Sequence, residues 1–198
     1  MRLFLNTTSP YARTARIALL EKGVTDFDTE FVDPWADAPA LLEANSAARV
    51  PTLVTDDGRA LTESLLIVLW LESQRPDPTL LGGHATATLA RAGIAMGVID
   101  AAVHTLIGRK TGDADFDESP VGLRRRRSMV QGLLRLEADP PRYTDGTPSL
   151  DVLTAVVALD YVDFRFPQAP WMPAPPALRR LVAQTASRAS FETSRPRA

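Results

Sequence analysis

The spacing of apolar residues changes at one segment of this chain, SQRPDPTLLGGHA at 73–85, which is rich in proline and glycine. Before it, short stretches of alternating apolar residues are interleaved with helical patterns. After it, apolar residues recur only at every third or fourth position. These two halves favour an α/β domain followed by an all-α helical bundle, because each kind of element must bury one face against another. We therefore expect domains at 1–76 and 85–198, joined by a linker at 77–84.

The first half predicts the element order βαβαββα. The expected strands are 1–6, 27–33 and two short segments within 50–64 that flank a turn at Asp57 and Gly58. The expected helices are 9–23, 36–45 and 63–73. A chain that starts with strand, helix and strand favours a mixed sheet with one parallel pair. The second half predicts four helices, at 86–108, about 118–138, 149–165 and 175–193.

The composition limits the chemistry that the chain can perform. It contains no cysteine, so disulfides, thiolate metal sites and cysteine nucleophiles are excluded, and any thiol must come from another molecule. Only two histidines are present, and we expect no metal site. A net charge of -2 argues against nucleic acid as a partner. No apolar run approaches the ~20 residues of a membrane span, and no secretion signal is visible, so we expect a cytoplasmic protein that does not bind membranes.

Ser9 and Pro10 stand directly before a helical pattern, in TTSPYARTARIALLEKG at 7–23. Serine is a common N-cap residue, and proline suits the first helical position. The same helix start carries unpaired amides and about half a positive charge, which stabilise a bound anion. The stretch therefore predicts a capped helix and leaves an anion site as the alternative.

Two further motifs follow at 49–64. In RVPTL, Pro51 opens a predicted strand although it cannot donate to a ladder, so it must lie at a strand start, an edge or a turn. If the bond between Val50 and Pro51 is cis, the main chain of Val50 turns outward and can pair with an extended peptide; otherwise Pro51 only starts the strand. In TES, Ser64 and the helix amides could receive a carboxylate while Glu63 faces an ammonium group, or the pair could simply start a helix.

Four stretches taken together resemble a bacterial cytosolic glutathione S-transferase. They are SPYARTARIALLEKG, RVPTLVTDDGRALTES, PSLDVLTAVVALDYVDFRFP and LRRLVAQTASRASFETSRP, and they cover nearly the whole chain in family order. The resemblance implies a thioredoxin-like N-terminal domain that binds glutathione, followed by a helical domain that shapes the pocket for an electrophilic second substrate. Glutaredoxin-like relatives carry CPYC where this chain has SPYA, so Ser9 and Ala12 replace both redox cysteines and disulfide exchange by this chain is excluded.

The resemblance also implies roles for particular residues. Ser9 would donate a hydrogen bond to the sulfur of glutathione, with Tyr11 as the rival hydroxyl and Thr8 as a third candidate. The remaining glutathione contacts would come from Arg49, Val50, Pro51, Glu63 and Ser64. Arg49 would meet the glycyl carboxylate, although a solvated arginine is the simpler alternative. The second-substrate pocket would include Tyr11, His104 and Arg109, although surface or core placement of His104 is the simpler alternative.

The expected activity is that of a glutathione transferase that activates the thiol for attack on a small hydrophobic electrophile. Glutathione is a co-substrate here, and no permanently bound cofactor is expected. The family resemblance implies a homodimer. Two alternatives remain: a binding or regulatory protein that has lost catalysis, and a glutathione-dependent peroxidase or isomerase on the same scaffold.

The chain departs from the family at the third stretch. Relatives place a serine or threonine cap with aspartate three residues later, whereas Ser149 is followed at that spacing by Val152, and Asp151 comes one position early. The capping box is therefore incomplete, which puts the stability of this helix in doubt.

Overall fold

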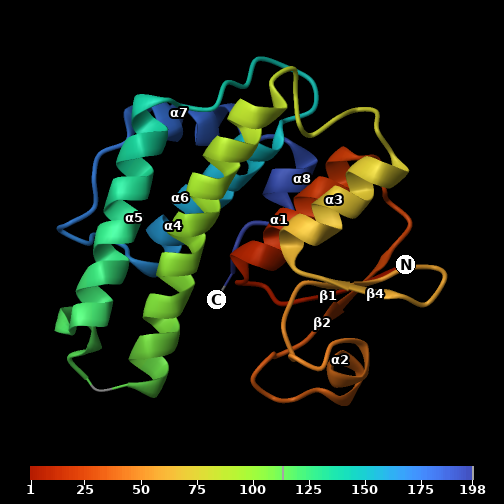
Figure 1. Cartoon of the computed structure of the whole chain (residues 1–198), viewed down its shortest axis with the longest axis horizontal. Helices are drawn as coiled ribbons and strands as arrows, with labels where there is room; N and C mark the ends of the chain where they lie inside the picture. Colours follow the sequence, from red (N-terminus) through yellow and green to blue (C-terminus); the bar gives the residue numbers. More distant parts are fainter. Residues whose placement is uncertain (113, 198) are drawn as a thin grey trace. The chain divides into compact units, whose positions relative to one another are not determined.

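The computed structural model describes residues 1–112 and 114–197, which form two compact units (Figure 1). The first unit is Met1–Leu80 together with the C-terminal segment that begins at Ser187, and the second is Leu81–Ala186. The first break falls within the linker expected at 77–84. The C-terminal segment groups with the first unit, whereas the sequence analysis placed it in the helical domain.

The first unit has the predicted order βαβαββα. Its strands are β1 (Arg2–Leu5), β2 (Asp28–Phe31), β3 (Thr52–Val54) and β4 (Ala60–Thr62), and its helices are α1 (Pro10–Glu21), α2 (Pro39–Ala44) and α3 (Ser64–Gln74). The sheet order is β2-β1-β3-β4, with β1 parallel to β2 and antiparallel to β3. The thioredoxin-like fold is thereby confirmed.

Apolar residues of α1, α3 and the central strands form the core of this unit. Leu3, Phe4, Ile17, Leu53 and Ile67 are all fully buried. The two ends of α1 are marked by residues that favour the start and the end of a helix. Pro10 opens α1, whose last turn is followed by Gly23 at a φ of +67°, a left-handed conformation that glycine adopts without steric cost.

The second unit is helical, as predicted. It contains α4 (Ala85–Thr111), a 3₁₀ turn η1 (Phe116–Glu118), α5 (Pro120–Ala138), α6 (Leu150–Arg165) and α7 (Pro176–Thr185). Helix α4 packs against both α5 and α6, and every residue from Leu150 to Leu159 in α6 is buried.

The sequence analysis expected no segment that could span a membrane. By length and apolar composition alone, however, α4 could cross a bilayer. Core helices of water-soluble bundles share both properties, and α4 has bundle partners along its length.

The helix expected at 175–193 is in fact two helices. Helix α7 ends at Thr185, and a short α8 (Ala189–Glu192) follows and packs on α1. The break has a physical reason, because Glu21 of α1 binds both Arg188 and Ser190 and draws this segment onto the first unit.

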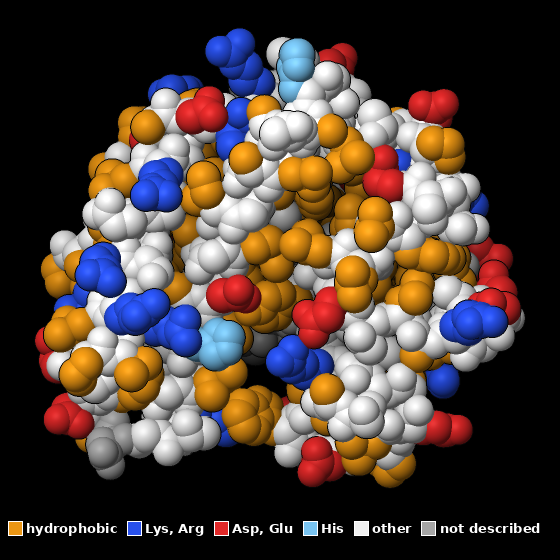
Figure 2. All heavy atoms as spheres, viewed as in Figure 1, with side chains coloured by type: hydrophobic (Ala, Val, Ile, Leu, Met, Phe, Trp, Pro, Cys, Tyr) orange, Lys and Arg blue, Asp and Glu red, His pale blue; other side chains and the backbone are white. Residues whose placement is uncertain are grey.

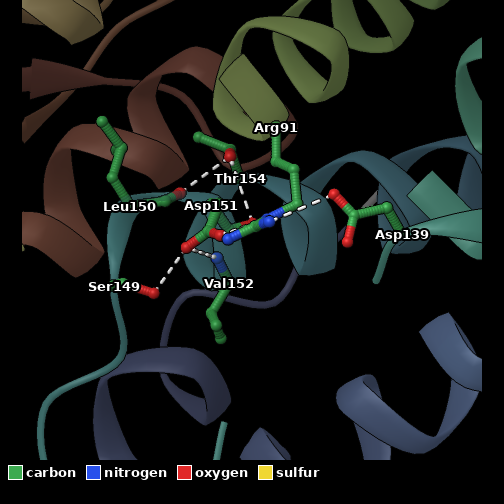
Figure 3. Close-up of polar contacts among 7 residues, drawn as sticks. All are labelled: Arg91, Asp139, Ser149, Leu150, Asp151, Val152 and Thr154. Atoms are coloured by element: carbon green, nitrogen blue, oxygen red, sulfur yellow. Dashed lines mark hydrogen bonds and ion pairs between the residues drawn. The ribbon is translucent and has the colours of Figure 1, made fainter. Parts of the chain in front are cut away.

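The start of α6 confirms that the capping box is incomplete (Figure 3). The side chain of Ser149 accepts no helix amide and instead donates to Oδ1 of Asp151 at 2.5 Å. The same Oδ1 accepts the Val152 amide at 3.0 Å, and Oδ2 of Asp151 accepts Nε of Arg91 at 2.7 Å. Arg91 also reaches Oδ2 of Asp139 at 3.2 Å. The buried Asp151 carboxylate is thus satisfied by an arginine of α4 as well as by its own helix.

Candidate functional site

Ser9 is the N-cap of α1. Its Oγ accepts the amide of Ala12 at 3.1 Å, and its own amide donates to Oδ1 of Asn6 at 2.7 Å. The side chain is half-buried. Within 1–112 and 114–197, no residue is seen to accept the hydrogen of the Ser9 hydroxyl. The helix therefore uses one lone pair of this hydroxyl and leaves its donor for a ligand.

Tyr11 and Thr8 lie within one turn of Ser9. Tyr11 belongs to the first turn of α1, and both of these side chains are half-buried. The Thr8 amide also points to Oδ1 of Asn6, at 3.3 Å. Asn6 therefore shapes this loop, a role that the sequence analysis missed. A polar residue directly after a strand and three positions before an N-cap was the available signal.

The loop before β3 holds Arg49, Val50 and Pro51. The peptide bond between Val50 and Pro51 is cis, which confirms the first of the two possibilities for this bond. Two buried side chains fix the loop. Oγ1 of Thr52 donates to the carbonyl of Arg49 at 2.8 Å, and Nδ2 of Asn45 donates to the same carbonyl at 3.1 Å and to Oγ1 of Thr52 at 3.0 Å. Asn45, only 8% exposed, is a positioning residue that the sequence did not identify.

Glu63 joins β4 to α3 with a strained backbone. Its φ is +64° and its ψ is +121°, a conformation that is costly for a residue with a side chain. Its Oε1 lies 2.9 Å from Nη1 of Arg49, so two residues predicted for one site are paired. Both side chains are mostly exposed, so this ion pair adds little stability.

Ser64 opens α3 and is only 2% exposed. In the described parts of the chain, no side chain caps this helix start, and no hydrogen bond to Oγ of Ser64 is found. A hydroxyl and first-turn amides without a capping side chain form a suitable receptor for a carboxylate.

The sheet register brings these three motifs to one end of the first unit. Phe4 pairs with Thr52 in the antiparallel β1 and β3, so the chain that leaves β1 toward Ser9 passes the Val50–Pro51 loop. Thr52 pairs with Thr62 in the antiparallel β3 and β4. The next residues outward, Pro51 and Glu63, therefore lie at the same end of the hairpin. The arrangement can hold an extended, zwitterionic peptide with its centre at the start of α1.

The two remaining predicted residues lie on α4, in the second unit. His104 is exposed, with Nδ1 2.7 Å from the carbonyl of Asp100. Arg109 binds Asp117 of η1 at 2.8 and 2.5 Å, and its guanidinium lies 4.8 Å from the ring centre of Phe166. Hydrogen bonding between these two groups raises the pKa of Arg109 and lowers the pKa of Asp117. Arg109 thus ties η1 to α4, and its contact with a substrate stays a prediction.

No cluster of three or more histidine and carboxylate side chains suited to a metal ion occurs among the residues that the structure describes. The polar groups of the site are hydroxyls, amides and one ion pair. Their chemistry is hydrogen bonding and charge stabilisation.

Comparison with known proteins gives matches over the whole chain. Residues 8–74 match the family model of the glutathione S-transferase N-terminal domain. The GST-like protein YibF of Escherichia coli K12 is 30% identical over 204 residues, which cover 99% of this chain and 98% of YibF.

Two solved structures are also similar over their full length. A glutathione S-transferase of Methylobacterium radiotolerans in complex with glutathione sulfonate has a TM-score of 0.89 and 32% identity, and the match covers 100% of this chain and 95% of that one. A glutathione S-transferase of Methylobacillus flagellatus with glutathione bound has a TM-score of 0.86 and 28% identity, with 99% of each chain covered.

Proposed function

Because this chain belongs to the glutathione S-transferase family, we propose that it binds glutathione at the end of its sheet and ionises the thiol beside Ser9. The observation that carries the proposal is the Ser9 hydroxyl, held at the start of α1 by the Ala12 amide with its hydrogen available. A free thiol has a pKa near 8.5 and is mostly protonated at neutral pH. A hydroxyl donor and a helix start together lower it by about one to two units, at ~1.4 kcal/mol per unit.

The other motifs hold the ends of the tripeptide. The main chain of Val50 pairs with the cysteinyl unit. The γ-glutamyl carboxylate binds the Ser64 hydroxyl and the first amides of α3, and Glu63 faces the ammonium group. Arg49 reaches the glycyl carboxylate from the same edge. Two similar proteins have glutathione or its sulfonate bound, which supports this assignment.

The reaction that follows is attack of the thiolate on a small electrophilic carbon. A carbon–sulfur bond forms after the thiol proton has passed to water. In a substitution the leaving group departs with its electron pair; in an addition the π electrons of the acceptor double bond shift to its far atom, which takes up a proton from water. Ser9 stabilises the sulfur anion and forms no covalent bond. A glutathione-dependent isomerase or peroxidase would use the same glutathione-binding site and would differ in its second substrate.

Binding and turnover measured side by side test this function. Isothermal calorimetry with glutathione should show binding at one site per chain, and chlorodinitrobenzene should be conjugated faster than in buffer. Binding with no turnover on a broad panel of electrophiles would favour the regulatory alternative. No binding of glutathione at all would refute the proposal.

We also propose that the protein forms a homodimer, as family resemblance implies. Helix α3 exposes three leucines, Leu65 at 39%, Leu66 at 56% and Leu69 at 65%, and hydrophobic side chains are visible over α3 in Figure 2. Exposed apolar groups of this density are typical of protein interfaces. Sedimentation equilibrium should give twice the 21.5 kDa chain mass, and Leu69→Glu should shift the protein to monomer. A cytoplasmic location and a role in detoxification stay predictions.

A further inference from the structure

Ser9 is held at three of its atoms. Its amide donates to Oδ1 of Asn6 at 2.7 Å, and its Oγ accepts the amide of Ala12 at 3.1 Å. Its carbonyl accepts the amide of Arg13 at 3.0 Å. Ala12 and Arg13 belong to α1, whereas Asn6 directly follows β1. The side chain of Asn6 therefore fixes the start of α1 relative to the end of the strand.

The loop at 6–9, which joins β1 to α1, has two ties. Oδ1 of Asn6 also accepts the amide of Thr8 at 3.3 Å, so one side-chain oxygen receives two main-chain amides of the loop. Asparagine fixes turns in this way. The second tie comes from the C-terminal segment, where the amide of Arg197 donates to the carbonyl of Thr7 at 3.2 Å. The loop is thus held by one of its own side chains and by the backbone of a segment at the other end of the sequence.

The segment that carries Arg197 is itself anchored along α1. Nη2 of Arg188 lies 2.6 Å from Oε2 of Glu21, in the last turn of α1. Nη1 of Arg16, earlier in the same helix, donates to the carbonyl of Thr193 at 3.2 Å. Figure 1 shows α8, which belongs to this segment, beside α1. Because these contacts fix the segment to α1, the amide of Arg197 has a defined position from which to hold the loop.

We propose that Asn6 and the main chain of Arg197 position the Ser9 hydroxyl against the sulfur of glutathione. A hydrogen bond weakens steeply when its donor turns away from the acceptor, so a displaced loop weakens it even when Ser9 is present. Both residues act through Ser9 and are therefore positioning residues. The inference rests on the proposed function and deepens it, because it makes the C-terminal segment part of the thiol site.

Two matched pairs of variants test the inference, each by titrating the thiolate absorbance of bound glutathione against pH. Asn6→Leu removes the acceptor of the loop amides, whereas Asn6→Ser keeps a hydroxyl that accepts them. Arg197→Pro removes the amide hydrogen, whereas Arg197→Ala removes only the side chain.

Asn6→Leu and Arg197→Pro should each raise the pKa of the bound thiol by about 0.7, a fivefold change, as expected for the loss of one hydrogen bond. The conservative variants Asn6→Ser and Arg197→Ala should stay close to the wild type. Calorimetry should show that all four variants keep nearly the wild-type affinity for glutathione, because the ends of the tripeptide are held elsewhere. A wild-type pKa in Asn6→Leu or Arg197→Pro would remove that residue from the account. Equal rises in Arg197→Pro and Arg197→Ala would exclude the amide.

Double variants show whether the effect passes through Ser9. Adding Asn6→Leu or Arg197→Pro to Ser9→Ala should leave the pKa where Ser9→Ala alone puts it, because no hydroxyl is left to position. Additive rises would overturn the inference, since the loop would then act on the sulfur without Ser9. The two ties are independent, so if thermal unfolding shows that one variant does not fold, the other still decides.

Two further outcomes concern the proposed function itself. Glutathione that fails to bind to the wild type, or a Ser9→Ala variant with the wild-type pKa of the bound thiol, would refute that function and this inference with it. A Ser9→Ala variant with a raised pKa beside unchanged Asn6→Leu and Arg197→Pro variants would refute the inference alone.

Discussion

The ammonium group of Lys22 is completely buried and forms an ion pair with Glu72. Its remaining donors bond the carbonyls of Arg75 at 2.6 Å and Pro78 at 2.7 Å. Lys22, the C-cap residue of α1, thus holds the C-terminal end of α3 and the segment that leads out of the first unit. The satisfaction of all three donors explains how a lysine can be buried here.

Replacing Lys22 by methionine should strongly destabilise the protein. The change leaves two carbonyls without their donor and the carboxylate of Glu72, 13% exposed, without its partner. Breaking a buried pair in this way costs about 3–5 kcal/mol. Urea unfolding should show the loss, whereas Arg49→Met, which breaks the exposed pair with Glu63, should cost no more than about 1 kcal/mol. Equal effects of the two substitutions would contradict this account.

The same ion pair predicts a loss of stability in acid. Burial alone would raise the pKa of Glu72, but hydrogen bonds from Lys22, the Leu80 amide and Thr79 outweigh it and lower the pKa. A carboxyl group with a lowered folded-state pKa stabilises the fold above its unfolded pKa of about 4.3, and this contribution disappears as the pH falls through the folded value. Unfolding free energies measured between neutral pH and pH ~3 should fall less steeply for Glu72→Gln than for the wild type. Parallel curves would show that Glu72 does not contribute.

Substitutions of Glu63 should affect the stability of the fold and the binding of glutathione separately. Its positive φ predicts that Glu63→Gly stabilises the fold by about 1 kcal/mol, because glycine adopts this conformation without strain. Removing the carboxylate should weaken the binding of glutathione about tenfold in both Glu63→Gly and Glu63→Gln. Thermal unfolding and calorimetry measure the two effects independently. A Glu63→Gln variant that binds like the wild type would remove Glu63 from the site.

Arg91 should be required for the start of α6. Arg91→Met leaves the Asp151 carboxylate, which is 2% exposed, without its cationic partner, and a cost of about 3 kcal/mol is expected. Adding Asp151→Asn to the variant should recover part of this loss, because the amide carries no charge to leave unpaired. Urea denaturation of the single and double variants checks both statements, and additive losses would show that the two residues are not coupled.

Much of this fold could be predicted because its signals are local. Pro10 and Ser9 mark the start of α1, Gly23 marks its end, and the alternation in residues 50–64 gives the β3–β4 hairpin. The three motifs of the candidate site were also visible, since each is a short stretch of residues with its own turn or cap chemistry.

The parts that were missed depend on contacts between residues far apart in the chain. Arg188 and Glu21 are 167 positions apart, and no periodicity in a single sequence reveals such a pair. The C-terminal segment was therefore assigned to the helical domain, and its approach to Ser9 could not be foreseen. The role of Arg91 was missed for the same reason, because Asp151 is 60 positions away.

The state of the bound thiol tests the central claim most directly. Thiolate absorbance of glutathione bound to the wild type, Ser9→Ala and Tyr11→Phe should be titrated against pH. We expect a pKa about one to two units below 8.5 in the wild type and in Tyr11→Phe, a clear rise in Ser9→Ala, and a ~10- to 100-fold loss of turnover in Ser9→Ala only. An unchanged pKa in Ser9→Ala, with the rise found in Tyr11→Phe instead, would contradict the role given to Ser9.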